Sequence, residues 1–136
     1  VRKAMKFFWL VALLFASPAQ AYTGQELRGD CQVADEMYAG QKSSDPFQAI
    51  RSARCIAYVA GFADSYAVTD YLTEQVGVKL NAFCLPKDPD LSLRLVRAVV
   101  IHVERVPPNT TVSPATLGAG AFAKSFPCSD SLESKK

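Results

Sequence analysis

Hydrophobic residues recur at helical spacing in the first half of the chain, between polar turn residues. The first such segment spans about 23–39, where Thr23 and Glu26 have the spacing of a capping box. The second runs from 46 to roughly 72, after a cap at Asp45 and a proline at the first helical position. Because this second segment is apolar on most sides, it is predicted to be the central, buried helix.

Two further helices are predicted in the second half. One begins near Asp88 and is stopped by Pro107. Its β-branched run 99–101 would also suit a strand, but the surrounding apolar residues keep a helical period. The last helix begins at a cap on Ser113 and ends before Pro127. The fold is therefore predicted to be all-α, a small bundle of about four helices built as two hairpins.

The first 21 residues have the pattern of a secretory signal peptide. Basic residues precede a short apolar core at 7–15, and an A-x-A cleavage pattern follows at 19–21. Nine apolar residues are too few to span a bilayer, which takes about 20. We therefore expect residues 1–21 to be removed on export and residues 22–136 to form a single domain with no stable membrane insertion.

The net charge of the domain becomes informative about its partner only after the predicted signal peptide is left out. The whole chain carries 15 basic and 13 acidic side chains, and three of the basic ones, Arg2, Lys3 and Lys6, lie in the predicted signal. The remaining domain is close to neutral. Nothing in its charge favours nucleic acid as a partner.

The four cysteines predict a disulfide framework, because an even number of cysteines is typical of exported domains. Cys31 and Cys55 lie equally far from position 43, and Cys84 and Cys128 equally far from position 106. If both positions are turns of helical hairpins, the two members of each pair face one another. Bonds 31–55 and 84–128 are thus predicted, although counting alone leaves 31–128 with 55–84 open. A zinc site is disfavoured because no C-x-x-C pair is present.

No arrangement of residues indicates catalysis, a cofactor or a metal. His102 is the single histidine, and its helical position suits a surface or boundary residue. Asp64 and Asp70 could pair as carboxylates, but we expect Asp64 to be a hydrogen-bonded structural residue and Asp70 to be solvated. All four cysteines are assigned to disulfides, so none remains as a reactive thiolate.

Three short motifs in order resemble those of the Rap/Tai-type immunity proteins of bacterial type VI secretion systems. They are C-I-A-Y-V-A-G-F-A-D at 55–64, F-C-L-P at 83–86 and F-P-C at 126–128. Members of that family are small, exported and helical. The family usually has glycine where this chain has Ala57, a change that should preserve helix packing. The motif residues look structural, with Gly61 allowing close approach of helices.

This resemblance implies a periplasmic immunity protein, not an enzyme, that binds a secreted effector. The effector would typically be a peptidoglycan amidase, neutralised by occlusion of its active site. A shared scaffold does not transfer contact residues, so candidates are taken from exposed connections, above all the segment 69–82 that matches no motif. The candidates are Tyr71, Glu74, Gln75, Lys79, Asn81, Arg105 and Asn109.

Two other functional classes, and assembly into a homodimer, also fit the sequence. A periplasmic acid-stress chaperone is likewise small, helical, exported and disulfide-bonded. A helical small-ligand carrier ranks below it, because the C-x-x-x-C pair typical of that class is absent. Tyr66, Tyr71 and the valine-rich third helix supply more apolar surface than one small core absorbs, so a homodimer is also predicted.

Overall fold

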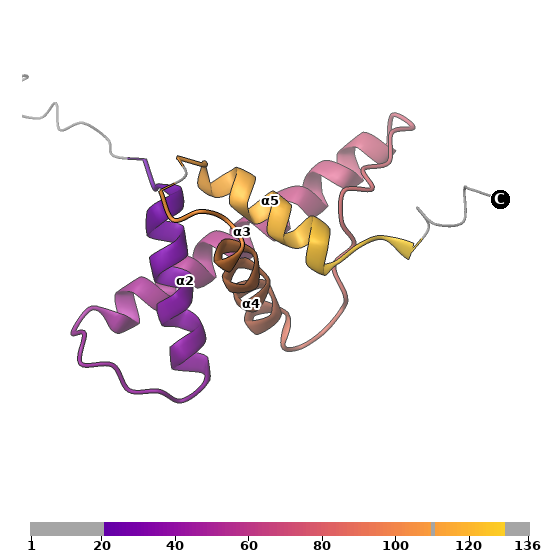
Figure 1. Cartoon of the computed structure of the whole chain (residues 1–136). Helices are drawn as coiled ribbons and strands as arrows, with labels where there is room; N and C mark the ends of the chain where they lie inside the picture. Colours follow the sequence, from indigo (N-terminus) through magenta and orange to yellow (C-terminus); the bar gives the residue numbers. More distant parts are fainter. Residues whose placement is uncertain (1–20, 110, 130–136) are drawn as a thin grey trace, which may run out of the picture.

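The computed structural model describes residues 21–109 and 111–129. Over these residues the chain forms helices and no strand, which confirms the all-α prediction (Figure 1). The β-branched run 99–101 is helical. Of the predicted signal peptide, all but its last residue lies outside the described residues. The helices are α2 (Gly24–Tyr38), α3 (Gln48–Glu74), α4 (Leu91–Glu104) and α5 (Pro114–Ser125).

The helices begin close to the predicted caps. Thr23 forms the complete capping box with Glu26, whose carboxylate accepts the Thr23 backbone N–H at 2.8 Å. Ser113 caps α5 in the predicted way, with proline in the first turn. Helix α3 begins two residues after its predicted start at 46. Asp45 accepts the backbone N–H of Phe47 and closes a turn before the helix begins.

The prediction that α3 is the buried central helix is wrong. With 27 residues it is about 40 Å long, about twice the length of any other helix, so its neighbours cannot cover it. In Figure 1, α3 lies behind α2, α4 and α5, which all pack on the same side of it. It buries only Ser52, Cys55, Val59 and Ala63. The most buried helix is α4, whose Leu95, Val96, Ala98, Val99 and Val103 form the centre of the core.

Both predicted disulfides are present, and no described cysteine is free. The bond between Cys31 and Cys55 joins α2 to α3. The second bond does not join two helices, however. Cys84 lies in the segment before α4 and Cys128 in the segment after α5, where the Cys84 N–H donates to the Phe126 carbonyl at 2.8 Å. The symmetry of spacing therefore predicted the right pair of cysteines. The expectation that this pair faces each other across a helical hairpin was wrong.

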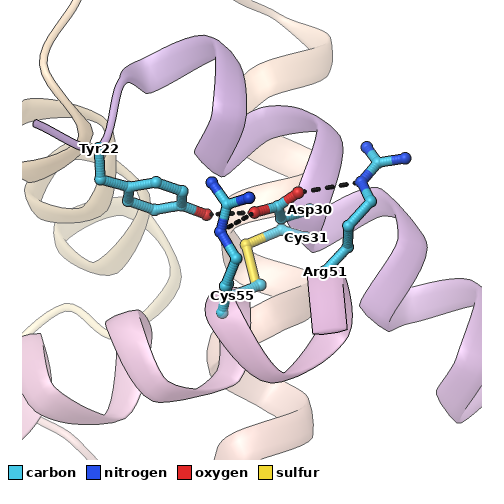
Figure 2. The surroundings of a disulfide bond; sticks show 6 residues. Tyr22, Asp30, Cys31, Arg51 and Cys55 are labelled. Carbon is cyan, nitrogen blue, oxygen red and sulfur yellow. Dashed lines mark hydrogen bonds and ion pairs between the residues drawn. A yellow bond between two sulfur atoms is a disulfide. The ribbon is translucent and has the colours of Figure 1, made fainter. Parts of the chain in front are cut away.

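A buried carboxylate next to the first disulfide fixes α2 against α3 (Figure 2). Asp30, only 3% exposed, accepts the Tyr22 hydroxyl at 2.9 Å and the Arg51 Nε at 3.0 Å. The Arg54 Nε lies 3.2 Å from its second oxygen. A buried charge is tolerated when it is paired and hydrogen-bonded in this way. Burial and the bond to Asp30 together raise the pKa of the Tyr22 phenol.

Candidate partner-binding site

The second half of α3 extends beyond the body of the bundle. After Ala63, no residue of the helix is buried. Figure 1 shows this half continuing past α5 and the chain turning back at its end. We call residues 70–82 the tip. It comprises the last turn of α3 and the return segment that leads toward Cys84.

Backbone hydrogen bonds close the end of α3 and define the turn. The N–H groups of Gly77 and Val78 donate to the carbonyls of Glu74 and Thr73, at 3.0 and 2.9 Å. These bonds satisfy carbonyls that a helix end otherwise leaves without partners. Gly77 has a φ of 80°, a conformation that favours glycine, and it lies in the turn that follows the end of α3.

Two side chains of α3 hold the return segment alongside the helix. The Asp70 carboxylate accepts the Leu80 N–H at 2.8 Å. The Tyr66 hydroxyl donates to the Leu80 carbonyl at 2.9 Å and accepts the Ala82 N–H at 3.0 Å. The Tyr66 ring stacks on Phe83, with 3.9 Å between ring centroids, and Phe83 belongs to the core. The tip therefore has a defined shape although it projects from the bundle.

Three α3 residues have roles in the structure that differ from those predicted. Asp70, predicted to be solvated, is a half-buried anchor, whereas Asp64, predicted to be structural, is exposed. Gly61 is exposed as well, and a Cβ placed there would meet nothing within 4 Å, so it does not serve close packing inside the chain. No sequence pattern relates Asp70 to Leu80, because their contact depends on the path taken through Gly77.

The tip brings together the first group of predicted contact residues, namely Tyr71, Glu74, Gln75, Lys79 and Asn81. All are exposed, Tyr71 to 63%. The structure adds two neighbours that the sequence did not single out, Val76 at 77% exposure and Val78 at 51%. The valines lie in a segment without periodicity, which gave no signal for them. Exposed apolar and aromatic side chains among polar ones are typical of the centre of a protein interface.

Arg105 and Asn109 lie elsewhere, at the end of α4 and in the connection to α5. That connection packs on α2, where Arg28 donates to the Val106 carbonyl at 2.7 Å and the Gln25 side chain donates to the Pro108 carbonyl. In Figure 1 the connection and the tip lie on opposite sides of α5. The seven predicted contact residues therefore form two separate groups.

His102 is a boundary residue of α4, as predicted. Its ring packs against α5 at Gly120, where a Cβ would lie 2.8 Å from the imidazole Nε2. Burial, and then the charges of Lys124 and Arg105, lower the pKa of His102 below its usual value. Its Nδ1 has no hydrogen-bond partner within the described residues, so no carboxylate orients it as a catalytic base.

Two further findings describe the same part of the chain. Residues 21–109 and 111–129 contain no cluster of histidine, cysteine and carboxylate side chains that could hold a metal ion. No helix within these ranges has the length and apolar character needed to cross a membrane.

One comparison with known proteins gave a match. The family model of the Rap1a immunity proteins matches residues 23–128. Comparisons with curated proteins and with solved structures gave no significant match. The matched range begins at the capping residue of α2 and ends at the last cysteine, so it takes in all four described helices and both disulfides.

Proposed function

Because the chain belongs to the Rap1a immunity protein family, we propose that it is a periplasmic protein that neutralises an effector of a type VI secretion system. The family itself implies an inhibitor of a secreted effector. Two disulfides and a signal-like N-terminal sequence support action outside the cytoplasm, since structural disulfides persist in oxidising compartments. We further propose that the effector is a peptidoglycan amidase.

The tip is the surface proposed to contact the effector. It projects from the bundle, which suits entry into a cleft that accommodates a polymeric substrate. The bonds made by Tyr66 and Asp70 hold it in one shape, so little conformational freedom is lost on binding. Tyr71, Val76 and Val78 supply the apolar contact that dominates the energy of most interfaces. Occupation of the active-site cleft by this segment would exclude the substrate.

The second group of candidates, Arg105 and Asn109, fits this role less well. No large apolar side chain is exposed between Arg105 and Ser113 among the described residues. Charged and polar side chains at the rim of an interface contribute little on their own. The projecting tip, rather than the α4–α5 connection, is therefore the proposed inhibitory element.

The test is co-expression with a candidate effector, a secreted peptidoglycan hydrolase, with that hydrolase directed to the periplasm. The wild-type chain is expected to prevent lysis and to co-purify with the hydrolase. Val76→Glu, which places a charge in the centre of the tip, is expected to lose protection. The matched control is Ile101→Glu, because Ile101 is a half-exposed apolar residue on α4, away from the tip.

The outcomes separate the two parts of the proposal. A wild-type chain that neither binds nor protects contradicts the immunity function. Full protection by Val76→Glu contradicts the role of the tip. A chain that ignores the hydrolase but keeps an unrelated client soluble at low pH would instead be the acid-stress chaperone.

We also propose a homodimer, although Tyr71 alone among the tyrosines and valines first expected to form its surface is largely exposed. Three of the four valines of the third predicted helix, Val96, Val99 and Val103, are buried in the core, and Val100 is partly buried. Tyr66 is half-buried and holds the return segment. The surplus of apolar surface lies instead on α3, on the face that no other described helix covers.

A further inference from the structure

A cavity of about 210 Å³ lies between the carboxyl-terminal parts of α4 and α5, two helices that pack against each other (Figure 1). Its polar wall consists of His102 and Arg105 at the end of α4, and of Lys124 and Ser125 at the end of α5. Small and apolar side chains of both helices complete the wall. None of the described aspartates and glutamates lines it. We call this space the basic cavity.

We infer that the basic cavity binds a small oxyanion from solution, a carboxylate or a phosphate-like group. This inference does not depend on the proposed function, because no residue of the tip lines the cavity. It rests on the convergence of basic side chains, on their lack of partners within the described chain, and on the size of the cavity.

The two permanent cations of the basic cavity have no counter-charge. Within the described residues, each of the other five arginines donates to a carboxylate or to a backbone carbonyl. The side chains of Arg105 and Lys124 form no ion pair or hydrogen bond there. Glu104, the carboxylate nearest to Arg105 in the sequence, does not line the cavity. Unpaired guanidinium and ammonium groups at one cavity are the donors that oxyanions prefer.

The properties of His102 show that positive charge converges on this wall. Burial, and then the charges of Lys124 and Arg105, lower the pKa of its imidazole. No described carboxylate acts in the opposite direction. The imidazole Nδ1 is also a buried polar atom without a hydrogen-bond partner among the described residues. The wall therefore carries a positive potential that the described chain does not compensate, and a bound anion would compensate it.

The helix ends near the cavity oppose an anion only weakly. The last helical residues of α4 and α5 are Glu104 and Ser125, so two carboxyl-terminal helix ends lie close by. Each such end acts like about half a negative charge, which gives about one negative charge for the two. The full positive charges of Arg105 and Lys124 exceed this, so the balance favours an anion.

The volume of the basic cavity selects a small ligand. Sites for larger organic ligands take about 300–1,000 Å³, whereas a single water molecule takes about 30 Å³. The cavity, with about 210 Å³, lies between these limits. It therefore suits a group of a few heavy atoms together with ordered water. The Arg105 guanidinium and the Lys124 ammonium can then donate to different oxygens of one oxyanion.

The single histidine of the chain reports the binding directly. The pKa of His102 would be measured by NMR, without an added histidine tag, in sodium sulfate, sodium acetate and sodium chloride at equal ionic strength. A bound oxyanion stabilises the charged imidazolium and raises its pKa, while chloride corrects for screening. We expect sulfate or acetate to raise the pKa by at least about 0.5 more than chloride does, which corresponds to about threefold tighter binding to the protonated chain. The anion with the larger effect identifies the preferred group.

Two double variants with the same change of net charge separate the cavity from general electrostatics. Arg105→Gln with Lys124→Gln is expected to lose the difference between the oxyanions and chloride. In chloride its His102 pKa should already exceed that of the wild type, because the two charges that lower it are gone. The matched control is Arg97→Gln with Lys87→Gln, since both residues are exposed and neither lines the cavity. This control should keep the wild-type difference.

Three results would overturn the inference. These are a wild-type pKa of His102 that is the same in all three salts, an undiminished response to sulfate or acetate after the changes at Arg105 and Lys124, and a response lost equally in the control variant.

Discussion

Replacing Asp70 with alanine should loosen the tip while leaving the bundle folded. The change removes the acceptor of the Leu80 N–H, a bond of 2.8 Å. A hydrogen bond to a charged group contributes about 1.5–3 kcal/mol. Because this one is only half-buried and water can replace the carboxylate, we expect a loss of about 1–2 kcal/mol. Tyr66 still holds the Leu80 carbonyl, so the loss should appear as local opening.

Amide hydrogen exchange measures that opening residue by residue. A loss of 1–2 kcal/mol corresponds to exchange about 5–30 times faster at Leu80 and Ala82, with little change in α4, whose core packing is untouched. Inhibition of the effector should weaken by a similar factor, because the open tip must be reordered on binding. Asp64→Ala is the control, an exposed aspartate on the same helix. Equal exchange rates in the two variants would refute the assigned role of Asp70.

Three further predictions concern the scaffold. Gly24→Ala should lower the free energy of unfolding in urea by about 1–3 kcal/mol or more, because its Cβ would lie 2.0 Å from the Val112 carbonyl oxygen; wild-type stability would contradict the close packing there. Since burial lowers the pKa of His102 from 6.5, the unfolded chain takes up the proton first. Unfolding should thus become easier as pH falls from about 6.5 toward the folded pKa. His102→Gln should remove that part of the pH dependence, and an unchanged slope would count against it. Replacing Cys31 and Cys55 together by serine should cost about 3.5 kcal/mol, measured by thermal unfolding, and an unchanged midpoint would show that the bond does not stabilise the fold.

The helices could be predicted because their signals are local. The capping box at Thr23, the cap at Ser113 and the stop at Pro107 act within one turn of the residues they control. The cysteine pairs could be predicted because each half of the chain folds back on itself. The geometry of the second pair could not, since symmetry of spacing does not say whether a cysteine lies in a helix or in the segment beside it.

The burial of α3 and the shape of the tip could not be predicted, because both depend on tertiary contacts. The apolar side chains of α3 suggested a buried helix, yet a helix of 27 residues outreaches partners of 12–15 residues. The contact of Asp70 with Leu80 and the position of Tyr66 follow from tertiary structure, as does the separation of Arg105 from the tip. Five of the predicted contact residues are exposed because they lie at or just beyond the end of α3, and their contact with a partner stays a prediction.

The central claim is that the tip neutralises the effector, and an inhibition titration tests it most directly. The hydrolase that the chain binds in the co-expression test would be assayed on purified peptidoglycan with increasing amounts of wild-type chain, Val76→Glu or Ile101→Glu. We predict stoichiometric inhibition by the wild type and by Ile101→Glu, and at least tenfold weaker inhibition by Val76→Glu. Equal inhibition by all three proteins would contradict the account.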